Sequence, residues 1–313
     1  MRFRPMGWCL LGLSLLLTEA SQSAPAAKII VHAGHLIADP GKPSLDNQSI
    51  IIENRKITAI VGGFVDGGRI VDLSQAWVMP GLIDMHTHVT VTMDIDSETP
   101  TSDFMPAFIG RPAARVLASE GRANSRTAHR LNRRVATHSV GSSAANQMAI
   151  EAGTDTIEHG PLSDLNIATM VKKGTAYVPT LLTAKLATQN PKIGVTVEYY
   201  LAAKASVTKA YKAHIPILFG TDLPITPIAR EWEEFLALQD AGLSIADVLK
   251  SATVNAAVGL GMADTLGSIE AGKFADMIAL AHDPRADLHE MGKVIFVMKG
   301  GKTVRDDLHG DLL

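Results

Sequence analysis

The chain has 313 residues, of which 46% are hydrophobic and 19% are charged, and its formal net charge is −3 at pH 7. This length fits one large domain, or a large domain with a smaller one, and the apolar fraction excludes a largely disordered chain. The small acidic net charge gives no basic footprint for nucleic acid, so no nucleic-acid partner is expected.

The N-terminal segment has the pattern of a secretory signal peptide. Two arginines precede an apolar stretch at residues 8–17, and residues 24–26 read Ala-Pro-Ala, an A-x-A cleavage site. The stretch is too short to cross a bilayer, which takes about 20 residues. The pattern predicts a signal peptide at residues 1–26 and an exported protein, periplasmic or extracellular, without membrane contact after cleavage. A retained amphipathic anchor is the alternative.

The only cysteine, Cys9, lies inside this predicted signal peptide. The mature chain would then have no cysteine, which excludes a cysteine nucleophile and a thiolate metal site. Any metal ion would have to be bound by nitrogen and oxygen atoms.

Short β-rich runs separated by turn residues occur at both ends of the remaining chain. They lie at residues 29–31, 49–52, 57–61, 277–280 and 294–298. Two or three strands are marginally stable in isolation. We therefore expect residues 27–76 and 263–313 to pair into one small β-sandwich that flanks a central domain at residues 77–262.

Strand and helix patterns alternate in the central domain, which predicts an α/β fold with parallel strands. The expected strands are residues 78–85, 134–139, 154–158, 176–180 and 215–219. Helical patterns follow at residues 228–238 and 244–259. The second begins with Ser244 and Asp247, which form a capping signal.

Four histidines and one aspartate stand at the carboxyl ends of these predicted strands. They are His86, His88, His138, His159 and Asp222. Residues i and i+2 of an extended chain point to the same side, so His86 and His88 can reach one ion. A single histidine at a strand end is more often structural, and an aspartate after Gly-Thr commonly begins a helix, but the recurrence of these residues at successive strand ends favours one shared site. The nitrogen and oxygen donors suit Zn²⁺ or another divalent ion.

Several motifs resemble the amidohydrolase superfamily, in particular its imidazolonepropionase-like and Xaa-Pro dipeptidase-like branch. They lie at residues 80–88, 157–160, 178–181, 220–222, 251–257 and 267–276. The resemblance covers nearly the whole mature chain. It implies a TIM-type (β/α) barrel flanked by the β-sandwich, and hydrolysis of carbon–nitrogen bonds with one or two metal ions.

The resemblance also implies a role for each of the five residues. His86, His88 and Asp222 would bind a first ion, and His138 and His159 a second. In members with one ion, His138 joins the first set and His159 contacts the substrate or water. Asp222 would also take a proton from the attacking water, so Asp222 and His159 are the expected catalytic residues.

One part of the family pattern is missing. Two-ion members bridge their ions with a carboxylated lysine, but the 49 residues between His88 and His138 contain no lysine. At about 30 residues per βα unit, roughly 120 residues would be expected there. We therefore predict an incomplete barrel without strands 2–4, a loop at residues 93–112 and a helix at residues 113–131. Evolutionary loss or splicing, an error in the gene structure, or completion by a partner chain could each explain the gap.

These features favour an enzyme that hydrolyses amide or cyclic amide bonds, other than ordinary peptide bonds, in a small molecule. A metal-activated water would attack the carbonyl carbon. Two alternatives stay open: a truncated, non-catalytic remnant, and a deaminase that hydrolyses an amidine. The exposed edges of an incomplete barrel would also favour a homo-oligomer.

Overall fold

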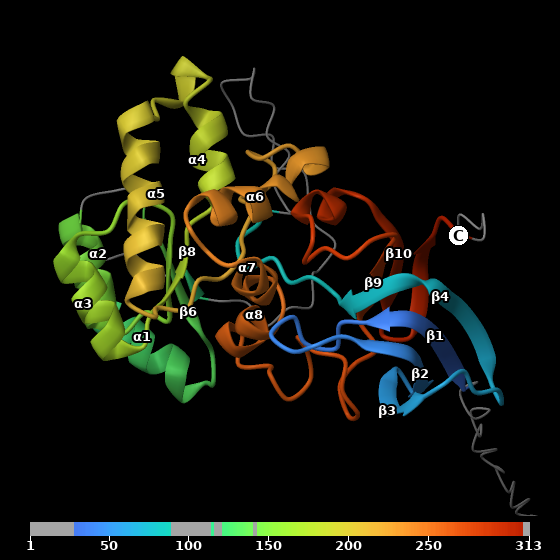
Figure 1. The fold of residues 1–313 in the computed structure, drawn as a ribbon. Coiled ribbons are helices and arrows are strands. Elements are labelled where there is room, and N and C mark those ends of the chain that lie inside the picture. The colour runs from blue at the N-terminus through green and yellow to red at the C-terminus, as the bar shows by residue number, and fades with distance from the viewer. Residues whose placement is uncertain (1–27, 89–113, 116–120, 140–142, 309–313) are drawn as a thin grey trace, which may run out of the picture.

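The computed structural model of the chain describes residues 28–88, 114–115, 121–139 and 143–308 (Figure 1). These residues form a mixed α/β fold with two sheets. The larger sheet has seven strands in the order β11-β10-β9-β4-β1-β2-β3, and the smaller has four in the order β5-β6-β7-β8. No helix among the described residues combines the length and the apolar character needed to cross a membrane.

The seven-stranded sheet combines the two ends of the chain. Its strands are β1 (Ile29–Leu36), β2 (Leu45–Glu53), β3 (Lys56–Gly62), β4 (Arg69–Pro80), β9 (Met277–Leu280), β10 (Val294–Lys299) and β11 (Lys302–Asp306). Strand β4 joins the two groups, parallel to β1 and antiparallel to β9. The predicted small β-sandwich is therefore one continuous hydrogen-bonded sheet.

The outer hairpins of this sheet meet at Ala275. The N–H of Ala275 donates to the carbonyl of Arg55 in the β2–β3 turn, at 2.9 Å, and its carbonyl accepts from Gly301 in the β10–β11 turn, at 3.0 Å. The hairpins thereby enclose one apolar core, to which both ends of the chain contribute: Ile50 and Ile52 from β2, and Phe296 and Met298 from β10.

The four-stranded sheet is parallel and carries helices along the chain, as the sequence predicted. Its strands are β5 (Ala114–Arg115), β6 (Val135–His138), β7 (Thr156–Glu158) and β8 (Ala176–Val178). The helices of this region are α1 (Gly121–Arg130), α2 (Ser143–Ala152), α3 (Asp164–Lys173), α4 (Leu181–Ala187) and α5 (Val197–Lys212), with a 3₁₀ turn η2 at Pro191–Ile193.

Three sequence expectations are wrong in their boundaries. Of the predicted strand at residues 78–85, only residues 78–80 are strand, and they belong to β4. Residues 215–219 run beside β8 through two backbone hydrogen bonds of Tyr177, but form no strand. Pro216 has no N–H to donate to a ladder, which is one physical reason. Of the predicted helix at residues 113–131, residues 121–130 are helix α1 and residues 114–115 are strand β5, whereas residues 116–120 lie outside the described residues.

The strands of the described residues do not close a barrel. The predicted loop at residues 93–112 lies outside the described residues. The loss of barrel strands 2–4 therefore stays a prediction.

The last helices are η3 (Ile228–Arg230), α6 (Glu233–Asp240), α7 (Ile245–Ser251), α8 (Val254–Gly259) and η4 (Leu288–Gly292). Helices α6, α7 and α8 lie between the two sheets (Figure 1), whereas η3 has no buried residue. Ser244 caps α7 as predicted, because its hydroxyl accepts the N–H of Asp247 at 3.1 Å. The predicted helix at residues 244–259 is split in two at residues 252–253.

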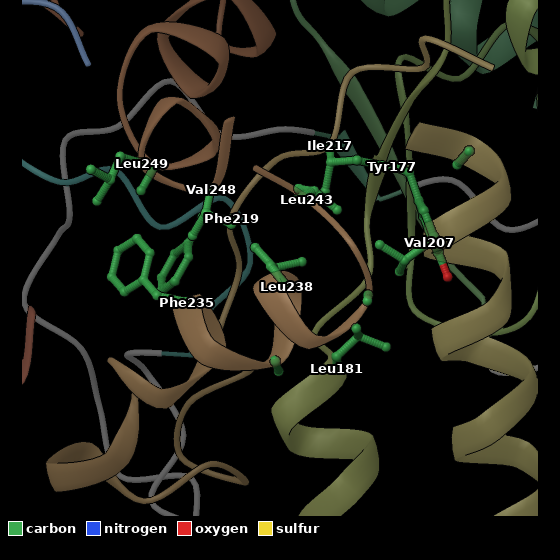
Figure 2. Packing of buried hydrophobic residues seen from close by; sticks show 14 of the residues in the cluster. Tyr177, Leu181, Val207, Ile217, Phe219, Phe235, Leu238, Leu243, Val248 and Leu249 are labelled. Carbon is green, nitrogen blue, oxygen red and sulfur yellow. The ribbon is translucent and has the colours of Figure 1, made fainter. Parts of the chain in front are cut away.

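One hydrophobic core joins these helices to both sheets. Met79 and Leu280 of the seven-stranded sheet belong to the same buried cluster as Tyr177 of β8. The rings of Phe219 and Phe235 stack with centroids 4.3 Å apart (Figure 2). This packing holds residues 215–219 against α6 and so fixes the position at which Asp222 follows.

Candidate metal centre

The structure brings all five residues singled out from the sequence into one cluster. His138 ends β6 and His159 follows β7, whereas the other three lie on segments without strand structure. Two groups of three have ligand atoms within 4.8 Å of one another: His86 with His88 and Asp222, and His86 with His138 and His159. His86 is common to both groups and therefore lies at the centre.

Backbone hydrogen bonds join the segment of His86 to the segment of Asp222. The N–H of Met85 donates to the carbonyl of Phe219 at 2.9 Å, and the N–H of Asp222 donates to the carbonyl of His86 at 2.7 Å. Another bond runs from the N–H of His88 to the carbonyl of Leu223, at 2.7 Å. The two segments thus form a short ladder that places both histidines beside the aspartate.

The carboxylate of Asp84 fastens this ladder. It accepts the N–H of His86 at 3.0 Å, the N–H of Thr221 at 3.1 Å and the hydroxyl of Thr221. Burial raises the pKa of Asp84 to about 6, against these hydrogen bonds. Asp84 was not predicted as a site residue, because an aspartate two residues before a histidine is an ordinary turn residue.

Asp222 and the histidines next to it form a strongly polar, largely buried group. Oδ1 of Asp222 lies 3.2 Å from Nε2 of His86 and 3.0 Å from Nε2 of His88. Burial raises the pKa of Asp222, but the two histidines hold it well below its ordinary value. Burial likewise lowers the pKa of His86, but Asp222 and Glu158 raise it to about 9. The cluster therefore favours positive charge at its centre.

Three polar atoms at this centre are buried and have no hydrogen-bond partner: Nε2 of His86, Nε2 of His159 and Oδ1 of Asp222. The close contacts of Asp222 with the histidines do not have hydrogen-bond geometry. A buried polar atom without a partner costs about 1–3 kcal/mol, so three together are unusual in a merely structural cluster. Imidazole nitrogens and a carboxylate oxygen are the donors that Zn²⁺ and similar ions take. The residues present fit a divalent ion.

Thr180 sets the orientation of the buried His159. Its hydroxyl donates to the carbonyl of Pro179 at 2.8 Å and lies 2.6 Å from Nδ1 of His159, so it accepts the Nδ1–H. Nε2 of His159 is then unprotonated and faces the cluster. Burial, together with the charge of His86, lowers the pKa of His159 to about 3, which keeps the ring neutral.

Glu234 of α6 holds the two residues that follow Thr180 in the chain. Its side chain is fully buried and accepts the N–H groups of Leu181 and Leu182, at 3.0 and 2.6 Å, where α4 begins. Burial raises the pKa of Glu234 to about 8, although both hydrogen bonds lower it. No sequence pattern pointed to Glu234, since a glutamate in the first turn of a helix is usually a solvated charge.

Comparison with known proteins identifies the protein family of this chain. The model of the amidohydrolase family matches residues 115–304. An uncharacterized protein of Mycobacterium tuberculosis (strain H37Rv) is 34% identical over 169 residues, which are 51% of this chain and 44% of that protein. A dihydroorotase of Syntrophus aciditrophicus (strain SB) is 42% identical over 66 residues, 20% of this chain and 15% of that protein. The matched part therefore spans less than half of these relatives.

Solved structures show the same fold. A crystal structure of a Xaa-Pro dipeptidase with bound methionine in its active site has a TM-score of 0.76 at 22% identity. The similarity covers 88% of this chain and 99% of that one. At this level of identity, the likeness establishes the architecture only.

Glu234 predicts a dependence of stability on pH. Its pKa is 4.5 in an exposed state and about 8 in the fold. Between these values the folded state holds a proton that the unfolded state has released, so stability falls as pH rises, by up to about 1.4 kcal/mol per pH unit. Glu234→Gln should remove this slope from the unfolding free energy measured by urea at pH 5–8 with a chelator present.

The variant also leaves an amide N–H₂ facing a backbone N–H, so it should be less stable than wild type at pH 5 and approach it at pH 8. Asp264→Asn, at an exposed position, is the control and should follow the wild-type curve. Parallel curves for Glu234→Gln and wild type would show that Glu234 is charged in the fold.

Proposed function

The chain belongs to the amidohydrolase family, whose members are metal-dependent hydrolases of carbon–nitrogen bonds, and we propose that it is such an enzyme itself. The observation that carries this proposal is the convergence of unpartnered Nε2 of His86, Nε2 of His159 and Oδ1 of Asp222. The family assignment and these donor atoms support the same chemistry independently.

We propose Zn²⁺ or a similar divalent ion as the cofactor. His86, His88 and Asp222 would bind it, with His138 as a further ligand and His159 directed to substrate or water. His86 belongs to both ligand groups, and no lysine lies between His88 and His138 to bridge a second ion. We therefore propose that the site binds one ion. If it binds two, His138 and His159 are the ligands of the second.

A bound divalent ion would lower the pKa of a coordinated water towards about 7 and polarise a carbonyl oxygen. Asp222 stays ionised, because its pKa lies below its ordinary value. Its carboxylate is thus available to accept a proton from the attacking water. His159 stays neutral and presents a lone pair at Nε2, so it can accept a hydrogen bond from water or substrate.

The substrate we propose is a small molecule with an amide or cyclic amide bond other than an ordinary peptide bond. Xaa-Pro dipeptidase and dihydroorotase, named among the similar proteins, support a carbon–nitrogen bond as the target. A truncated, non-catalytic remnant is the second candidate, because the described strands do not close a barrel. Association of copies through the open sheet edges stays a prediction.

The first test is metal binding. Purified protein should contain a divalent ion, and Zn²⁺ added after chelation should raise the melting temperature; at 100 times the dissociation constant the gain is about 2.7 kcal/mol. His86→Ala should sharply reduce the rise at a fixed Zn²⁺ concentration and leave only a weak site of the remaining four residues, because His86 belongs to both ligand groups. His282→Ala, an exposed position outside the cluster, should keep it. Absence of both a co-purified ion and a Zn²⁺-dependent rise would refute the enzyme proposal.

The second test is a panel of N-acyl amino acids, Xaa-Pro dipeptides, cyclic ureas and amidines. Hydrolysis of at least one amide class is expected, and Asp222→Asn should lower kcat by a factor of about 10²–10⁴ through loss of the general base. Turnover of amidines alone would assign a deaminase instead. Metal binding without turnover of any compound would favour the non-catalytic remnant.

We also propose export, supported only by the signal-peptide pattern of residues 1–26. This segment lies outside the described residues. Expression in a bacterium with an intact secretion system should yield a mature chain that begins at Ala27, as read by N-terminal sequencing of the periplasmic or secreted fraction. A chain that keeps its first residues and stays in the cytoplasm would contradict the proposal.

A further inference from the structure

Glu158 is a buried carboxylate beside the metal centre that the proposed chemistry does not use. It ends β7, directly before His159, and only 2% of its surface is exposed. Its two oxygens have separate partners: Oε1 accepts the hydroxyl of Thr156, and Oε2 lies 3.2 Å from Nδ1 of His86. A carboxylate is expensive to bury, so a position with such partners implies a use for it.

The alternation of side chains along β7 explains where Glu158 points. Ile157 packs into the hydrophobic core shared with the helices, so Thr156 and Glu158 face the opposite side of the strand. Strand β7 lies between β6 and β8, and Glu158 is opposite His138 on one side and Val178 on the other. The neighbouring strands on both sides therefore fix the position of the carboxylate beside the cluster.

A carboxylate oxygen accepts a hydrogen bond from the imidazole N–H beside it, so Nδ1 of His86 carries a proton toward Glu158. When the ring is neutral, as a ligand of a cation must be, its lone pair is then on Nε2, the buried atom without a hydrogen-bond partner at the centre. His159 is oriented in the same sense, but by the neutral hydroxyl of Thr180. His86, which belongs to both ligand groups, is thus oriented by a carboxylate, whereas His159 is oriented by a neutral hydroxyl.

The charge of the ligand groups explains why His86 contacts a carboxylate and His159 only a neutral hydroxyl. Asp222 is the only carboxylate in either ligand group, so neutral histidines with Asp222 leave a divalent ion with one uncompensated positive charge. Glu158 can supply the second negative charge through the ring of His86. We infer that Glu158 is a positioning residue that orients His86 and strengthens its binding of a divalent cation, an inference that rests on the proposed metal centre.

Glu158→Gln tests this inference because it removes the charge and keeps the size and the hydrogen bonds. The amide oxygen can accept from Nδ1 of His86, and the amide N–H₂ can donate to the hydroxyl of Thr156. We expect Zn²⁺ affinity, measured by competition with a chromophoric chelator, to fall about 10- to 100-fold. Urea unfolding of the metal-free variant serves as the check that the fold is intact.

A double-mutant cycle separates action through His86 from a general effect on the fold. In a His86→Ala background, Glu158→Gln should cause no further loss of Zn²⁺ affinity, since the ring that links Glu158 to the ion is gone. Glu151→Gln, an exposed glutamate on α2, is the matched control and should bind Zn²⁺ as wild type does. An equal loss in both backgrounds would overturn the inference.

The remaining outcomes are also decisive. If wild type binds no Zn²⁺, the proposed metal centre fails and the inference fails with it. If wild type binds Zn²⁺ and Glu158→Gln binds it equally well, only the inference is overturned. If Glu158→Gln does not fold, Thr156→Val, which removes one clamp on the carboxylate, decides instead: a loss of Zn²⁺ affinity of at least about threefold supports the inference, and unchanged affinity overturns it.

Discussion

The ladder between residues 85–88 and 219–223 is the contact on which the metal centre depends. Neither segment is a strand of a sheet, so these backbone hydrogen bonds, with the carboxylate of Asp84, hold His86 and His88 beside Asp222. Asp84 and Thr221 are 137 residues apart, so the ladder joins two segments that are distant along the chain. Phe219, at one end of the ladder, stacks on Phe235, and this buried apolar contact stabilises the ladder.

Forming the cluster is costly for the protein. His159, Thr180 and Asp222 all have a positive φ, of 66°, 46° and 55°, a backbone conformation that costs a residue with a side chain roughly 1–2 kcal/mol. Such strain persists only where the surrounding structure enforces it, and it is concentrated at functional sites. Two of these strained residues, His159 and Asp222, also carry a buried atom without a hydrogen-bond partner. A cation that satisfies those atoms would offset part of both costs.

The sequence predicted which residues gather in the cluster better than it predicted the residues that support them. His86, His88, His138, His159 and Asp222 could be found because each ends an apolar run, and strand ends of an α/β fold meet at one edge. The bounds of two of those runs were wrong, since hydrogen bonding and not apolar pattern decides whether a run becomes a strand. The supporting roles of Glu234 and Thr180 could not be predicted, because only the folded chain brings α6 against the start of α4. Supporting residues of this kind have no local pattern.

Metal binding and turnover are separable in this fold. The ligand cluster is held by the β7–β8 part of the parallel sheet, by the ladder, and by a core that also contains Met79 and Leu280 of the seven-stranded sheet. None of these contacts needs a closed barrel. A substrate pocket does need walls around the ion, and only 49 residues separate His88 from His138, where a full barrel would have roughly 120. The five clustered residues could therefore bind a cation without a closed barrel, whereas the choice of substrate depends on the residues that form the walls around the ion.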